Sequence, residues 1–206
     1  MERRDNYRAQ LEQAKQTFLH YDQQKLIEKL KLPHDEAYLY PNLLGSRYRI
    51  HRKNGDFQRQ REESWVDATT HSEVMTLLDL ICDSREDRFL AHRWKDMVGF
   101  GRMFHQNLHE TDPWALRFQE DPEALARACT ALGGVIFPNG DVAYEMELFD
   151  GLPLVLQLWL GDEEFPPRLR FLWDENARMY LKYETMYFAK ALLLNRIREY
   201  MEHDKL

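Results

Sequence analysis

The sequence predicts an α+β fold, in which an antiparallel sheet is packed with N-terminal, middle and C-terminal helices. Apolar residues recur at helical spacing near both ends of the chain, and two other stretches show the period of two that is typical of strands. The predicted strands follow one another in runs instead of alternating with helices, which favours antiparallel pairing. We expect the sheet to comprise a basic hairpin and a C-terminal meander.

Three segments before the meander are predicted to be helical. The first carries apolar residues three or four positions apart, at Tyr7, Leu11, Ala14, Phe18 and Tyr21. Asp22 could restart or kink this helix, and Leu26, Ile27 and Leu30 continue its apolar face until Pro33 ends it. Thr70 and Glu73 form a capping-box pattern at the start of the second helix. The third begins at Asp121-Pro122 and ends at Gly133-Gly134.

The hairpin is predicted from the alternation in residues 47–51 and 57–59. Asn54-Gly55 between them is the preferred pair for a two-residue type I′ turn. That turn would place Lys53 opposite Asp56 and Ile50 opposite Arg59. One face is then solvated and carries Arg47, Arg49, His51, Gln58 and Gln60, and the other lies on a core through Tyr48, Ile50 and Phe57.

The meander is predicted from residue 142 to residue 173. Alternating apolar residues in 142–148, a tight turn at Asp150-Gly151 and the nearly continuous apolar run Leu154–Leu160 indicate two paired strands. Leu169–Trp173 then returns as a third strand. Asp174 directly after it is placed to cap the last helix.

Length and composition predict one globular domain spanning residues 1–206. With 44% hydrophobic and 31% charged residues, the chain is too apolar for a disordered protein and too charged for a membrane protein. No apolar run approaches the roughly 18 residues of a membrane span, and the N-terminus lacks the apolar segment of a secretory signal. Its two cysteines, Cys82 and Cys129, fit a reducing compartment, so we expect a cytoplasmic protein.

The net charge of −7 is unevenly distributed. Residues 1–65 carry 13 Lys and Arg against 10 Asp and Glu, whereas the rest of the chain has a net charge of −10. The basic excess is concentrated in residues 47–61. An acidic body beside this patch makes nucleic acid an unlikely partner, and it makes a homodimer formed through opposite patches plausible.

Several motifs together resemble a known family. They are Arg93-Trp94, Val98-Gly99-Phe100, Gly133-Gly134, Leu152-Pro153-Leu154, Trp159-x-Gly161-Asp162-Glu163-Glu164-Phe165-Pro166 and Phe171-Leu172-Trp173-Asp174-x-x-Ala177. This pattern resembles the domain-of-unknown-function family numbered 3786, found mainly in anaerobic bacteria and archaea. The resemblance covers most of the chain and implies a fold unit and an anaerobic setting, but no reaction. Some relatives carry iron–sulfur cysteine motifs, and this chain has none, so no cluster is expected.

The long stretch Arg85–Thr111 has no clear period and is rich in aromatic residues. A loop of this length inside a compact domain is usually functional. We expect a pocket for a small planar or apolar ligand between residues 94–105 and the strand end at 159–164, in a non-catalytic ligand-binding or accessory domain of anaerobic metabolism. Its candidate residues are Arg93, Trp94, Phe100, Arg102, His105, Trp159, Asp162 and Glu164. The alternative is that the aromatic residues only clamp the loop onto the sheet.

Two other functions stay open, and no cofactor is identified. Five carboxylates, Asp162, Glu163, Glu164, Asp174 and Glu175, are expected at one end of two adjacent strands. Asp162 or Glu164 could serve there as an acid or base, with a divalent cation and His105. His105 and His109 have helical metal-ligand spacing but no third ligand in register, so they are weak candidates. The third function is a protein- or nucleic-acid-binding module that uses the basic hairpin.

Overall fold

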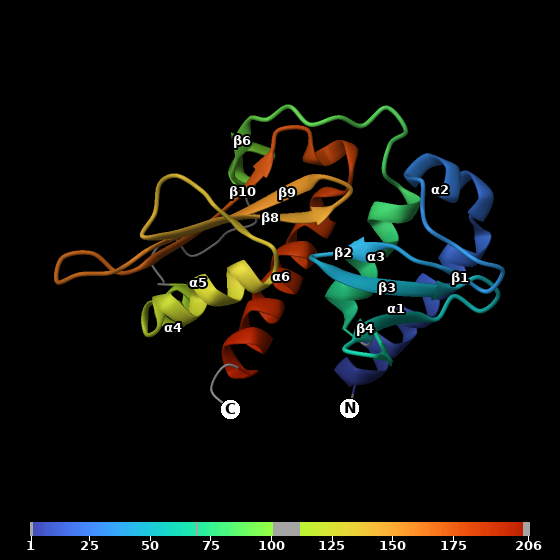
Figure 1. Ribbon diagram of the computed structural model, residues 1–206, viewed down its shortest axis with the longest axis horizontal. Helices are drawn as coiled ribbons and strands as arrows, with labels where there is room; N and C mark the ends of the chain where they lie inside the picture. Colours follow the sequence, from blue (N-terminus) through green and yellow to red (C-terminus); the bar gives the residue numbers. More distant parts are fainter. Residues whose placement is uncertain (1, 69, 101–111, 204–206) are drawn as a thin grey trace. The chain divides into compact units, whose positions relative to one another are not determined.

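The α+β class is confirmed by a computed structural model, which describes residues 2–68, 70–100 and 112–203, with side chains from residue 9 to residue 202 within these ranges. The chain divides into two compact units (Figure 1). They consist of Met1–Phe89 with Arg178–Leu192, and of Leu90–Ala177 with Leu193–Leu206. Each unit holds one antiparallel sheet, so the basic hairpin and the meander belong to different sheets. No helix within the described ranges is long and apolar enough to cross a membrane.

The first unit contains a five-stranded sheet and three complete helices. The strand order is β1-β3-β4-β5, and β2 pairs with β3. In chain order the elements are α1 (Glu2–His20), α2 (Gln23–Leu30), β1 (Tyr38–Leu39), β2 (Asn42–Leu43), β3 (Ser46–His51), β4 (Phe57–Arg61), β5 (Ser64–Asp67) and α3 (His71–Cys82), together with the first part of α6 (Tyr183–His203).

Helices α1 and α3 cover the inner face of this sheet. Phe18 of α1 packs edge-on against Phe57, with ring centroids 6.1 Å apart. The Tyr48 hydroxyl donates to Glu73 of α3 at 2.6 Å. Helix α3 begins as the capping box predicts, because the Thr70 side chain accepts a hydrogen bond from the Glu73 amide. The predicted division of the hairpin into a buried and a solvated face is therefore confirmed.

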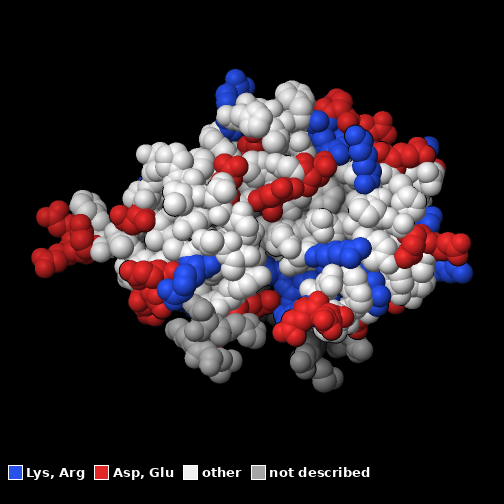
Figure 2. Space-filling model, viewed as in Figure 1, with Lys and Arg blue, Asp and Glu red and all other residues white. Residues whose placement is uncertain are grey.

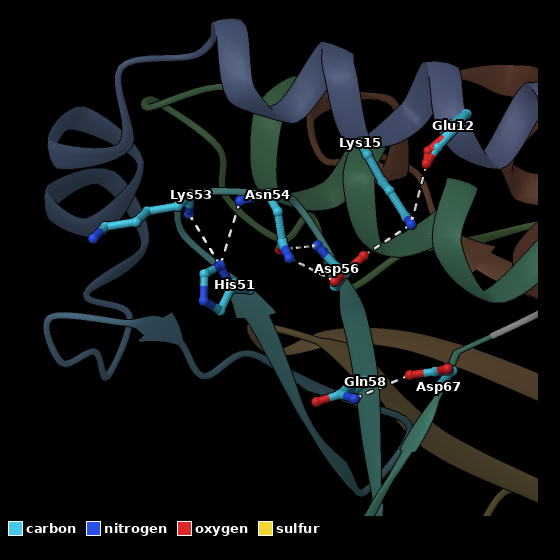
Figure 3. Close-up of polar contacts among 8 residues, drawn as sticks. All are labelled: Glu12, Lys15, His51, Lys53, Asn54, Asp56, Gln58 and Asp67. Atoms are coloured by element: carbon cyan, nitrogen blue, oxygen red, sulfur yellow. Dashed lines mark hydrogen bonds and ion pairs between the residues drawn. The ribbon is translucent and has the colours of Figure 1, made fainter.

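The hairpin register differs from the predicted one. Ile50 lies opposite Phe57, not Arg59, and five residues (52–56) connect β3 to β4 instead of two. Figure 3 shows why the longer loop is stable: the His51 ring accepts from the Lys53 and Asn54 amides, at 3.2 and 3.3 Å. These two hydrogen bonds give the Lys53 and Asn54 amides an acceptor inside the longer loop.

One basic residue of the expected patch lies in the interior, because it is on the same face of β4 as Phe57. Arg59 is only 7% exposed and lies opposite Tyr48 on the inner face. Its Nε is 3.6 Å from the Glu73 carboxylate. Arg59 thus neutralises a buried acid of α3, because a buried charge requires a partner.

The second unit contains the meander, which forms a sheet with the order β6-β10-β9-β8-β7. In chain order its elements are β6 (Trp94–Lys95), the 3₁₀ helix η1 (Met97–Phe100), α4 (Pro113–Gln119), α5 (Pro122–Ala131), β7 (Val135–Ile136), β8 (Val142–Phe149), β9 (Leu152–Trp159) and β10 (Arg168–Asp174), followed by η2 (Ala177–Met179), which extends into the first unit. The third predicted helix is confirmed as α5, which begins with Pro122 and is capped by Asp121.

Asp174 does not cap the last helix, because α6 starts nine residues later at Tyr183. Its side chain is only 1% exposed and accepts hydrogen bonds from the amides of Ala91, His92 and Asn176, at 3.0, 2.7 and 2.8 Å. The carboxylate therefore fastens the segment before β6 to the end of β10. Sequence pattern alone could not distinguish this tie from a helix cap.

Candidate functional site

One face of the second sheet brings polar and aromatic side chains together. Residues directly opposite each other in adjacent strands point to the same face. By the register, the pairs Trp159–Arg168, Gln157–Arg170 and Trp94–Asp174 lie on this face. Phe137 bonds through its amide to the Ala143 carbonyl, and Ala143 lies opposite Gln157. We call the set Trp94, Phe137, Gln157, Trp159, Arg168 and Arg170 the polar–aromatic face.

The centre of the polar–aromatic face is a buried amide opposite an arginine. Gln157 is 3% exposed, and its amide nitrogen donates to the carbonyls of Pro138 and Asn139, at 3.3 and 2.8 Å. Its Oε1 has no hydrogen-bond partner among the described residues. The buried Nε of Arg170 likewise has no hydrogen-bond partner among the described residues. A terminal nitrogen of the same guanidinium donates to Asp96 at 3.0 Å. An acceptor and a donor thus lie on neighbouring residues, and each costs about 1–3 kcal/mol when left unsatisfied.

Aromatic rings flank this centre on both sides along the strands. The Arg168 guanidinium lies 6.0 Å from the Trp159 ring centroid. At the other end, Trp94 packs edge-on against Phe137, with centroids 5.1 Å apart. Trp94 and Trp159 are opposite the two ends of β10, a strand of seven residues, and are therefore about 20 Å apart along it. The polar centre lies between them.

The remaining predicted ligand residues fall in three places. Arg93 forms an ion pair with Glu175, which also pairs with Lys95 at 2.6 Å. These two cations lower the pKa of the Glu175 carboxyl through their hydrogen bonds. Phe100 ends η1 and is half-buried. Three candidates lie outside the described residues, namely Arg102, His105 and His109.

The acidic turn lies in the connection between β9 and β10. Asp162 is exposed and accepts from the amides of Glu164 and Phe165, both at 2.8 Å. These backbone bonds lower the pKa of the Asp162 carboxyl, whereas a general acid at neutral pH requires a raised pKa. The prediction that five carboxylates meet at one strand end is wrong, because Asp174 lies at the opposite end of β10.

The described residues offer neither a reactive thiol nor a metal cluster. Burial raises the pKa of both Cys82 and Cys129 to about 12, so neither is a thiolate at neutral pH. No three His, Cys, Asp or Glu side chains in residues 9–68, 70–100 and 112–202 are grouped so that they could hold a metal ion.

Sequence reasoning missed Gln157, Arg170 and Phe137. Gln157 interrupts the apolar run of β9, and a polar residue at such a position signals a hydrogen-bonded interior site. Arg170 alternates with Leu169 and Phe171, which places it on the other face of the same strand. Phe137 gives no comparable signal, because its contact with Trp94 depends on the fold of the whole sheet.

Comparisons with known proteins give one result. The model of the domain of unknown function DUF3786 matches residues 22–196, which includes every residue of the polar–aromatic face. No curated protein and no solved structure matches the chain significantly.

Proposed function

Since the chain belongs to the DUF3786 family, a domain of unknown function, we propose its role from its own geometry: the polar–aromatic face binds a small planar molecule. The observation that carries this proposal is the pair of unsatisfied buried atoms, Gln157 Oε1 and Arg170 Nε. The proposal treats the chain as one cytoplasmic domain in the anaerobic setting that the sequence resemblance implies.

The two atoms define the chemistry of the ligand edge. Gln157 Oε1 accepts a hydrogen bond, so the ligand supplies an N–H or O–H group. Arg170 Nε donates, so the ligand also supplies a carbonyl or carboxylate oxygen. Side chains directly opposite in an antiparallel pair have Cβ atoms about 5 Å apart, which lets one ligand edge meet both. Cyclic amides have such an edge on a planar ring.

The surrounding contacts favour this ligand. A terminal nitrogen of the Arg170 guanidinium donates to Asp96, and the Gln157 amide nitrogen donates to the carbonyls of residues 138 and 139. Both groups are therefore oriented before binding, which lowers the entropy cost of the complex. Trp159 is half-buried at the neighbouring register position and offers its ring to a planar molecule.

A thermal-shift series tests the proposal with uracil, hypoxanthine, benzoate and indole at millimolar concentration. Uracil and hypoxanthine carry adjacent donors and acceptors, whereas benzoate lacks the donor and indole lacks the acceptor. We expect only the two cyclic amides to raise Tm, by a few degrees once their concentration is about ten times Kd. Arg170→Met and Trp159→Leu should remove the shift.

Arg117→Met is the matched control, because Arg117 belongs to the same unit and forms an exposed pair with Glu202 at 2.8 Å. This variant should keep the full shift.

A single bridging water would satisfy Gln157 Oε1 and Arg170 Nε without any ligand, and no probe would then raise Tm. Equal shifts in Arg170→Met and the wild type, or no shift with any of the four probes, would overturn the proposal.

A further inference from the structure

The outer face of the first sheet carries an ordered array of arginine and aromatic side chains. The Arg49 guanidinium lies 4.5 Å from the Tyr38 ring centroid and 4.6 Å from that of Trp65. Arg47 lies 4.8 Å from the Tyr40 ring, which itself contacts Trp65 with centroids 6.2 Å apart. We call these five residues the arginine–aromatic face. In Figure 2, Lys and Arg side chains gather over β3 and β4, the strands labelled in Figure 1.

The Arg49 side chain is held in one orientation. Besides the two rings, Gln58 Oε1 accepts from its Nε at 2.7 Å, and the Gln58 amide donates in turn to Asp67 at 3.0 Å. Among the described residues, the terminal nitrogens of Arg49 have no hydrogen bond. Arg47 is exposed, and within the part of the chain that the structure describes it contacts the Tyr40 ring and forms no ion pair or hydrogen bond. Two guanidinium edges are therefore available to bind an oxyanion in the paired geometry that a carboxylate matches.

We propose that the arginine–aromatic face binds an extended acidic segment of a partner protein, with Asp or Glu at alternate positions. Arg47 and Arg49 are two residues apart on β3, so they point to the same side at a spacing of about 6.7 Å. Alternate side chains of an extended chain have this same spacing. Two successive carboxylates of such a segment can therefore each pair with one guanidinium.

Nucleic acid fits the same face less well. Single-stranded nucleic acid binds through free ring faces on which bases stack. Here Arg49 occupies a face of both Tyr38 and Trp65, and Arg47 occupies a face of Tyr40. The net charge of −7 also repels a polyanion beyond the patch. A short acidic segment needs only the two arginines.

Fluorescence anisotropy tests this proposal with a labelled eight-residue peptide in which Glu and Thr alternate. The comparison probes are a peptide of the same composition with its four Glu consecutive, and a labelled twelve-residue oligothymidylate. We expect the alternating peptide to bind more tightly than either. Arg49→Ala should weaken it about tenfold, because one charged hydrogen-bonded pair is lost.

Two further variants distinguish geometry from charge. Arg49→Lys keeps the charge but loses the planar fork, so it should also weaken binding severalfold. Lys53→Ala removes one positive charge from the loop of the same hairpin. Figure 3 shows that the Lys53 side chain points away from the sheet, so this variant should change the binding affinity less than twofold. Equal weakening by Lys53→Ala and Arg49→Ala would overturn the proposal, as would tighter binding of the oligothymidylate or equal binding of the two peptides. Tm values of Arg49→Ala and Arg49→Lys within a degree or so of the wild type exclude loss of folding as the cause, and Arg47→Ala should weaken binding in the same way.

Discussion

The Lys182 ammonium forms an ion pair with Asp79, at 3.1 Å, although the Asp79 side chain is only 5% exposed. Lys182 lies just before α6 and also pairs with Asp83, at 2.5 Å. Its amide donates to the second Asp79 oxygen at 2.6 Å. One residue thus fastens the start of α6 to the end of α3 by three contacts within the first unit.

Lys182→Met is expected to destabilise the protein by about 1–3 kcal/mol. The substitution leaves the Asp79 carboxylate buried without its ammonium, and an uncompensated buried charge is costly. Urea unfolding followed by circular dichroism measures the change. Asp87→Asn is the control, because Asp87 forms an ion pair with Arg85 at 2.6 Å but the two side chains are 66% and 59% exposed. That exposed pair should contribute less than about 1 kcal/mol, and equal losses in both variants would contradict the buried-charge explanation.

Tyr21→Phe should show a stability loss that depends on pH. The Tyr21 hydroxyl donates to Asp83 at 2.5 Å, and this bond raises the pKa of Tyr21 to about 12. Since the folded state favours the protonated phenol, the stabilisation is complete below pH 10 and disappears as the pH rises towards 12. Urea midpoints of the wild type and Tyr21→Phe should therefore differ at pH 8 and converge at the alkaline end. A constant difference across this range would show that the hydroxyl acts by packing alone.

Helices and strands that carry a local sequence pattern, such as a capping residue or a run of apolar residues, were predicted from the sequence. Thr70 and Asp121 begin helices as their capping patterns indicate, because a cap is an interaction within four residues. In the meander, β8 follows from its alternation and β9 from its nearly continuous apolar run. The short strands β1, β2, β6 and β7 have only two residues each, which is too few to show any period.

The candidate site was harder to predict because it depends on pairing between distant residues. Trp94 and Trp159 were expected to lie together, but they lie opposite the two ends of β10. The centre between them is formed by Gln157 and Arg170, which are thirteen positions apart in the chain and meet only through the β9–β10 register. A shift of one residue in that register would send their side chains to opposite faces.

Gly55→Ala should cost more stability than Gly133→Ala. Both glycines have positive φ, +72° and +77°, so alanine is strained at each by about 1 kcal/mol. A Cβ at Gly55 would also lie 3.0 Å from the Lys15 carbonyl oxygen of α1, whereas a Cβ at Gly133 meets no atom within 4 Å. The contact with rigid helix backbone should add about 1–3 kcal/mol at Gly55. Thermal unfolding of the two variants checks this, and equal Tm losses would mean that α1 moves aside.

Asp174→Ala should destabilise the second unit by about 3 kcal/mol, because it leaves three amides without their acceptor. One of them belongs to His92, whose φ of +53° is unfavourable for a residue with a side chain and is held in place by this carboxylate. Hydrogen exchange of the Ala91, His92 and Asn176 amides should accelerate at least about tenfold in the variant. Asp174→Asn keeps one acceptor oxygen and should lose less stability.

Asp162→Ala is the matched control for Asp174→Ala. Asp162 also accepts from two backbone amides, but it is exposed, so water can replace it at a cost below about 1 kcal/mol. Equal losses of stability in the two alanine variants would show that the hydrogen bonds of the buried Asp174 carboxylate stabilise the protein no more than those of the exposed Asp162 carboxylate. A large loss confined to Asp174→Ala would show that this carboxylate, which the sequence pattern assigned to a helix cap, instead supports the strand edge on which Trp94 lies.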